Sequence, residues 1–191
     1  MVTDTRTQIV EAADMLFYRH GFDHTSFADI AEAVQISRGN FYYHFRTKDE
    51  ILAAVIDHRV ENTKRMLDDW EAAAGDNPAD AIRAFIHILI DNRTDIKRYG
   101  CPVGTLTAEL AKLSHEAQGD ANALFTLFRR WLARQFRALG RKADADALAL
   151  HLLARSQGVA TMANAFRNDA FVRREVEAMG DWLDARILEI P

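Results

Sequence analysis

The chain has 191 residues, enough for one large domain or two small ones with a real hydrophobic core. Nine glycines and three prolines are few, which disfavours an all-β sandwich or barrel with its many turns. With one cysteine, no cleavable apolar leader and no apolar run of about 18 residues, the chain is expected to be soluble and cytoplasmic. The formal net charge of −4 argues against coating nucleic acid by bulk charge, although it leaves room for a local basic patch.

Apolar residues recur at helical spacing along the chain, and no alternating pattern runs far enough to predict a strand. Thr5 and Gln8 have capping-box spacing in the first predicted helix, Gly21 is placed to end it, and Thr25 or Ser26 is expected to cap the second. The predicted helices cover approximately residues 5–20, 27–34, 38–45, 48–74, 78–90, 102–113, 116–139, 144–167 and 170–189. We therefore expect an all-α protein with about nine helices.

The second and third predicted helices are separated only by Gln35, Ile36 and Ser37, a spacing typical of a helix-turn-helix. The third helix is short enough to enter a DNA major groove. Phe41 and Phe45 lie one turn apart and are expected to face the core. Between residues 33 and 48 there are basic and aromatic side chains but no Asp or Glu, so positive charge is concentrated on this element.

The stretch from Thr25 to Leu52, TSFADIAEAVQISRGNFYYHFRTKDEIL, closely resembles the DNA-binding domain of TetR-family transcriptional repressors. Its most specific part begins at Ser37, and it departs from the family at Phe41, where leucine is more usual. The resemblance implies a homodimer that binds a palindromic operator on double-stranded DNA and is released by a small-molecule inducer. It further implies a DNA-binding domain over residues 1–52 and a larger ligand-binding and dimerisation domain over residues 53–191.

The same resemblance implies which side chains contact DNA. Those expected at base edges are Ser37, Arg38, Gly39 and Asn40, with Gly39 allowing close backbone approach. Those expected at phosphate or sugar are Thr25, Tyr42, Tyr43, His44 and Lys48. The alternatives are half-buried tyrosines, a solvated face for Arg38 and Asn40, a simple cap at Thr25, and a lysine that merely stands at a helix start.

The last two predicted helices carry long apolar stripes, and by resemblance they pair with their mates in a four-helix dimer interface. Alternatively, both stripes face only the core of their own chain. The inducer site is less well marked, because any single candidate can also be a core or surface residue. The candidates are His87, Tyr99, Cys101, Thr105, Glu109, Trp131, Gln157, Met162 and Phe166.

Cys101 supports a separate hypothesis, in which a thiol at the start of a helix senses oxidants or electrophiles and triggers release. The alternative is a cysteine that packs as a small apolar side chain. Two other functions are alternatives for the whole chain: an enzyme, and a helical small-molecule-binding module without DNA binding. No HExxH motif, cysteine-rich zinc set or Gly-rich phosphate loop is present, so no catalytic residue, metal or cofactor is predicted.

Overall fold

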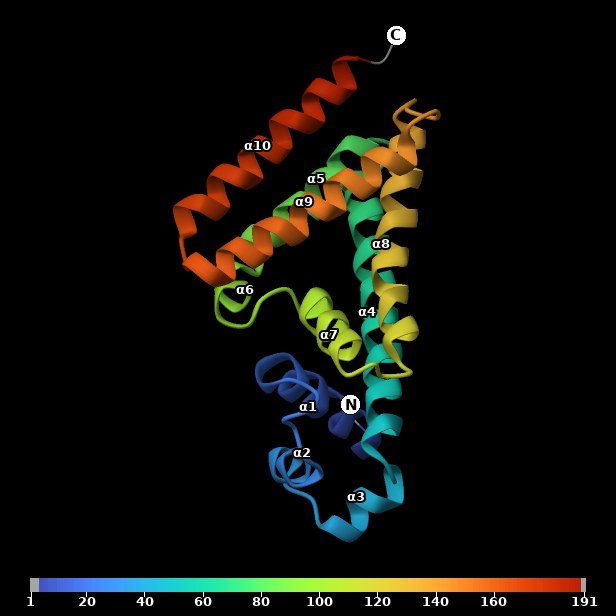
Figure 1. Ribbon diagram of the computed structural model, residues 1–191. Coiled ribbons are helices and arrows are strands. Elements are labelled where there is room, and N and C mark those ends of the chain that lie inside the picture. Colours follow the sequence, from blue (N-terminus) through green and yellow to red (C-terminus); the bar gives the residue numbers. More distant parts are fainter. Residues whose placement is uncertain (1–3, 190–191) are drawn as a thin grey trace. The chain divides into compact units, whose positions relative to one another are not determined.

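The computed structural model describes residues 4–189, and the regular secondary structure of this range is entirely helical (Figure 1). Its helices are α1 (Thr5–His20), α2 (Phe27–Val34), α3 (Arg38–His44), α4 (Lys48–Ala74), α5 (Pro78–Asp91), α6 (Arg93–Tyr99), α7 (Pro102–Lys112), α8 (Gln118–Ala138), α9 (Ala145–Phe166) and α10 (Asp169–Leu188). The all-α prediction is confirmed. The short helix α6 was not predicted, because Ile96 is its one buried residue and gives no periodic stripe.

The capping prediction at the first helix is wrong. Asp4 is the N-cap of α1 and makes no side-chain capping bond, while Thr5 already lies in the first turn. The amide of Gln8 donates to the carbonyl of Asp4 at 3.0 Å, an ordinary helical bond. Gly21 ends α1 as predicted, with a φ of 90° that favours glycine.

The two helices of the predicted helix-turn-helix are each capped by a serine. Ser26, rather than Thr25, caps α2: its hydroxyl accepts from the Asp29 amide, and the Asp29 carboxylate accepts from the Ser26 amide. Ser37 caps α3 by accepting from the amide of Asn40 at 3.3 Å. Between them, Gln35 adopts a left-handed conformation with a φ of 58°. Reciprocal capping and this tight turn fix where each helix begins.

The described chain forms two compact units. The first comprises the described residues up to Asn62 together with Thr105–Leu124, and the second comprises Thr63–Gly104 and the described residues from Phe125 onward. Helices α4, α7 and α8 each contribute residues to both units. The helix-turn-helix unit therefore takes in a segment from the middle of the chain.

The first unit has its own core, in which Phe41 and Phe45 are 1 % and 2 % exposed, as their spacing predicted. Phe41 meets the ring of Phe27 edge to face, with 5.2 Å between centroids. Arg59 of α4 pairs with Asp14 of α1 at 2.6 Å on the margin of this core. Leu106, Leu110 and Ala121 from the inserted segment join it, and so the unit is built from two separate stretches of chain.

The second unit is centred on α5, α8, α9 and α10, and α9 and α10 run antiparallel beside each other (Figure 1). Arg83 of α5 bonds Asp184 of α10 at 2.5 Å, and Lys97 of α6 bonds Asp169 at 2.6 Å. Polar contacts thus join the ends of helices whose apolar faces form the core. Within residues 4–189, no helix is long and apolar enough to span a bilayer.

Candidate nucleic-acid interface

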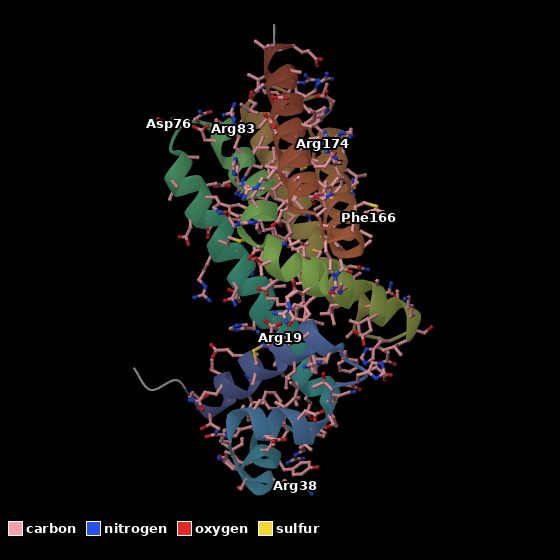
Figure 2. All side chains as sticks on the ribbon, turned by 90° about the vertical axis from the view of Figure 1, so that its left-hand side faces the viewer. Arg19, Arg38, Asp76, Arg83, Phe166 and Arg174 are labelled. Atoms are coloured by element: carbon pink, nitrogen blue, oxygen red, sulfur yellow. The ribbon has the colours of Figure 1, made fainter. Side chains whose placement is uncertain are left out.

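Helix α3 buries one face and exposes the other. Phe41 is in the core, whereas the neighbouring Tyr42 and Tyr43 are 53 % and 84 % exposed. The four residues predicted to reach base edges are also exposed: Ser37, Arg38, Gly39 and Asn40. Figure 2 shows Arg38 on the outer side of this helix. Two adjacent exposed tyrosines form a surface with aromatic faces and hydroxyl donors, the groups that contact nucleic-acid backbones.

Gly39 lies in the first turn of α3, where neither the packing nor the backbone conformation of the folded chain requires a glycine. A Cβ placed on it meets no atom within 4 Å, and its backbone has no positive φ. Glycine in a helix costs roughly 0.5–1 kcal/mol relative to alanine. The folded chain gives no reason for this cost, whereas close approach of the α3 backbone to an outside surface does.

A hollow of about 330 Å³ lies between the start of α2 and the outer side of α3, with Arg38 and Tyr42 among its lining residues. Phe27 and Ala28, the first two residues of α2, also line it, and the amides of a helix's first turn have no intrahelical acceptor. Such amides bind phosphate well, because they point outward at the positive end of the helix dipole. Sequence reasoning missed these backbone donors, although the Ser-x-x-Asp capping spacing at residues 26–29 was a signal for them.

Asp29 stands at the same helix start and is committed to the chain's own backbone. The Ser26 amide donates to its carboxylate at 2.8 Å and the Ser26 hydroxyl at 2.7 Å, and these bonds lower the pKa of the Asp29 carboxyl. Because the carboxylate stays ionised, it keeps Ser26 occupied. The Ser26 amide is therefore not available to an outside anion, unlike the amides that follow it in the first turn of α2.

Three of the predicted backbone contacts are less accessible than the tyrosines. His44 is half-buried with its ring 5.1 Å from that of Tyr43. Thr25 is 2 % exposed, and its hydroxyl donates to the carbonyl of Gly21 at 2.7 Å. Lys48 donates from Nζ to the carbonyls of Phe22 and Asp23 at 3.0 and 3.2 Å. An ammonium has three donors, so Lys48 has one beyond these two bonds, whereas the Thr25 hydroxyl already has its acceptor.

The nine candidates for a ligand site do not form one group. Thr105 and Glu109 belong to the first unit, where Glu109 accepts from the amides of Phe22 and Asp23. Glu109 therefore gains no support as a ligand contact, because its carboxylate oxygens already bind the chain. His87 borders a hollow of about 400 Å³ between α5 and α10.

Four of the six remaining candidates occupy three places in the second unit. Trp131 is 4 % exposed, and its indole Nε1 has no hydrogen-bond partner among the described residues. Met162 and Phe166 are 40 % and 71 % exposed on α9, with Phe166 visible at its outer side in Figure 2. Half-buried Tyr99 ends α6.

Cys101 and Gln157 lie close to the first turn of α7. The amide of Gly104 donates to Cys101 Sγ at 3.5 Å, and a Cβ placed on Gly104 would lie 2.6 Å from Gln157 Oε1. Glycine at this position lets α7 and Gln157 approach closely. Thiol-triggered release through Cys101 stays a prediction.

A short exposed helix held by a tight turn against a second helix defines a helix-turn-helix DNA-binding protein. Comparison with known proteins agrees. Residues 9–55 match the family "Bacterial regulatory proteins, tetR family", and residues 78–177 match "Transcriptional regulator LmrA/YxaF-like, C-terminal domain". The chain belongs to the TetR family of bacterial transcriptional regulators.

Individual relatives extend the match over almost the whole chain. The HTH-type transcriptional regulator TtgR of Pseudomonas putida is 28% identical over 193 residues, covering 95% of this chain and 89% of TtgR. The HTH-type transcriptional repressor DhaR of a Mycobacterium species is 23% identical and covers 93% of both chains. The crystal structure of a TetR regulator from Legionella pneumophila has the same fold, with a TM-score of 0.83, 22% identity, and coverage of 97% and 98% of the two chains.

The family assignment confirms that this chain is a DNA-binding transcriptional regulator. It also argues against the alternative that the chain is an enzyme, because the family consists of regulators and not of enzymes. Regulators of this family bind DNA operators and small-molecule ligands and are dimeric.

Proposed function

We propose that this protein represses transcription as a homodimer whose two α3 helices bind successive major grooves of a palindromic operator, and that a small-molecule inducer releases it. The observation that carries the proposal is the exposed face of α3, where Arg38, Asn40, Tyr42 and Tyr43 surround a glycine the fold does not need. The repressor DhaR, similar over nearly its whole length, supports repression as the direction of control. Residues 1–52 carry DNA binding, and residues 53–191 carry ligand binding and dimerisation.

Some side chains of α3 contact base edges in this proposal, and others contact the sugar-phosphate backbone of the DNA. Arg38 and Asn40 reach base edges, where a guanidinium matches guanine and a carboxamide matches adenine. Tyr42 shares the hollow at the start of α2, so one phosphate there is held by its hydroxyl and by the α2 amides. Tyr43 and the remaining donor of Lys48 contact neighbouring phosphates. In this assignment specificity comes from the first turn of α3, and general affinity comes from the surrounding donors.

The exposed side of α9 supports dimerisation. Between Ala147 and Phe166, the exposed positions carry no Asp, Glu, Lys or Arg. They are Ala147, Leu150, His151, Ala154, Gly158, Thr161, Met162, Ala165 and Phe166. An uncharged exposed side that runs from Ala147 to the end of the helix at Phe166 is typical of a protein interface. The small residues at its centre let a partner helix approach closely, so we propose that α9, with α10, pairs with its mate.

The inducer site is proposed for the second unit, among the candidates that lie there. Trp131 offers the clearest polar contact, because its buried indole N–H lacks an acceptor and a ligand oxygen would supply one. Trp70 packs 5.9 Å from it and provides an aromatic wall. These residues favour an apolar or aromatic inducer that carries at least one hydrogen-bond acceptor.

Selection from a randomised pool of DNA duplexes, with purified protein at near-physiological salt, tests this function. We expect enrichment of a two-fold symmetric site, whose affinity falls steeply as salt rises because phosphate contacts release counterions. Enrichment of an asymmetric half-site would contradict the dimeric mode. Failure to enrich any sequence, repeated after unfolding and refolding to remove a bound ligand, would favour the ligand-binding module without DNA binding.

Gly39→Ala is expected to weaken operator binding by about tenfold or more while leaving the fold intact, because the new methyl separates α3 from the groove floor. Inside the protein the methyl meets nothing within 4 Å, and the free energy of unfolding is expected to rise by up to about 1 kcal/mol. Fluorescence anisotropy with the selected operator and chemical denaturation measure the two effects.

Gly119→Ala is the matched control for this change. Gly119 also occupies the second position of a helix, also belongs to the first unit, and a Cβ on it also meets nothing within 4 Å. We expect operator affinity to stay within about twofold for this variant. Equal losses in both variants would show that Gly39 has no special place at the DNA.

A further inference from the structure

The loop between α1 and α2 is held from opposite sides by two charged side chains of the first unit. Glu109 of α7 accepts from the amides of Phe22 and Asp23, each at 2.9 Å. Lys48 of α4 donates to the carbonyls of the same two residues, at 3.0 and 3.2 Å. A carboxylate thus binds both N–H groups and an ammonium binds both C=O groups of two consecutive residues. Charge-assisted bonds of this kind are stronger than those between neutral groups.

The residues next to these hydrogen bonds, Gly21 and the side chain of Phe22, are also held in place by close contacts. A Cβ placed on Gly21 would lie 2.9 Å from Glu109 Oε1, and Gly21 has a φ of 90°, so glycine here is required both by the turn and by the carboxylate. The Phe22 side chain is 4 % exposed. Lys48 lies 4.3 Å over its ring and the His115 ring packs against it edge to face. Backbone and side chain of Phe22 are therefore both fixed.

The held loop leads directly into the DNA-binding surface. Thr25 follows it and donates its hydroxyl back to the carbonyl of Gly21 at 2.7 Å. The next residue, Ser26, caps α2, whose first two residues line the hollow that Arg38 and Tyr42 also line. Any shift of the loop moves the start of α2 relative to α3, and with it the spacing between the first amides of α2 and the donors of α3.

We propose that Glu109 is a positioning residue for DNA binding: it touches no base or phosphate, yet it sets operator affinity by holding the loop that places the start of α2. The inference rests on the proposed operator binding.

Two replacements at Glu109 separate its effects. Glu109→Ala leaves both loop amides without their acceptor, and Glu109→Gln keeps one acceptor oxygen while placing N–H donors against the other amide. We expect operator affinity to fall by about tenfold or more in Glu109→Ala, with Glu109→Gln between it and the parent protein. Glu116→Gln is the control, because Glu116 is exposed in the same inserted segment and the change removes the same charge.

Hydrogen exchange followed by NMR on the full chain, with fluorescence anisotropy for the selected operator, distinguishes positioning from general stability. Exchange is expected to accelerate at the amides of Phe22 and Asp23, while core amides of α1 and the melting temperature change little. A purely structural role would accelerate exchange throughout the first unit and lower the melting temperature in proportion to the loss of binding.

Several results would overturn the proposal. Parent-like operator affinity in Glu109→Gln and in folded Glu109→Ala would do so, as would an equal loss in Glu116→Gln. If Glu109→Ala unfolds, Glu109→Gln alone tests the proposal. Amide exchange at Phe22 and Asp23 as slow as in the parent protein, or unchanged operator affinity, in Glu109→Gln would contradict it. Such failures leave the proposed function standing, whereas absence of operator binding in the parent protein removes both.

Discussion

Phe41→Ala is expected to destabilise the first unit by about 3–5 kcal/mol, because it removes most of a fully buried aromatic side chain and leaves a cavity. Phe41 is 1 % exposed and packs its ring on Phe27 of α2. Since whole domains are stable by only about 5–15 kcal/mol, this loss removes a large share of the first unit's stability and is expected to weaken operator binding. Urea denaturation followed by circular dichroism and tyrosine fluorescence measures the change.

Tyr43→Ala is the companion variant, because Tyr43 is an aromatic residue of the same helix that is 84 % exposed. Its free energy of unfolding is expected to change by no more than about 0.5 kcal/mol, while operator affinity falls roughly equally for all sequences. A large stability loss in Tyr43→Ala, or none in Phe41→Ala, would show that the inward and outward faces of α3 are assigned incorrectly.

Ala154→Glu is expected to convert the homodimer to monomers, because it places a carboxylate at the centre of the uncharged exposed side of α9. Burying that charge at an interface without a partner costs several kcal/mol per subunit, while the separated monomer loses only a few tenths in helix propensity. Two half-sites then bind independently, and operator affinity falls by roughly 10²–10⁴. Analytical ultracentrifugation and operator titration measure both consequences.

Ala73→Glu is the control for this change, since Ala73 is an exposed alanine on α4 in the same unit. It adds the same charge away from the proposed interface and is expected to leave the dimer intact. Persistence of the dimer in Ala154→Glu would exclude this side of α9 as the interface, and a monomeric Ala73→Glu would point to α4 instead.

Local features of the fold could be predicted from the sequence because they depend on neighbours along the chain. Gly21 was recognisable as the end of the first helix and Ser26 as one of two candidate caps of the second, and the structure has both in those places. The inward direction of Phe41 and Phe45 followed from helical spacing alone. Helix α6 escaped prediction because seven residues with one buried side chain carry no period.

The long-range contacts that determine what Glu109 and Lys48 bind could not be predicted from the sequence. Glu109 and Phe22 are separated by 87 positions, and Lys48 and Phe22 by 26, so nothing in the local pattern joins them. From the sequence, Glu109 was one of the ligand candidates, and Lys48 was expected to contact phosphate or merely to stand at a helix start. For the same reason the nine ligand candidates, chosen one by one, do not converge on a single place.

The inserted segment has a consequence for how this regulator is made on the ribosome. Leu106, Leu110 and Ala121 belong to the core that contains Phe41 and Phe45, so this core is incomplete when the helix-turn-helix residues alone have been synthesised. It is completed once the chain has grown past Ala121, in the first turn of α8. A fragment truncated before that point is therefore expected to bind an operator weakly, because the core beneath α3 lacks part of its packing.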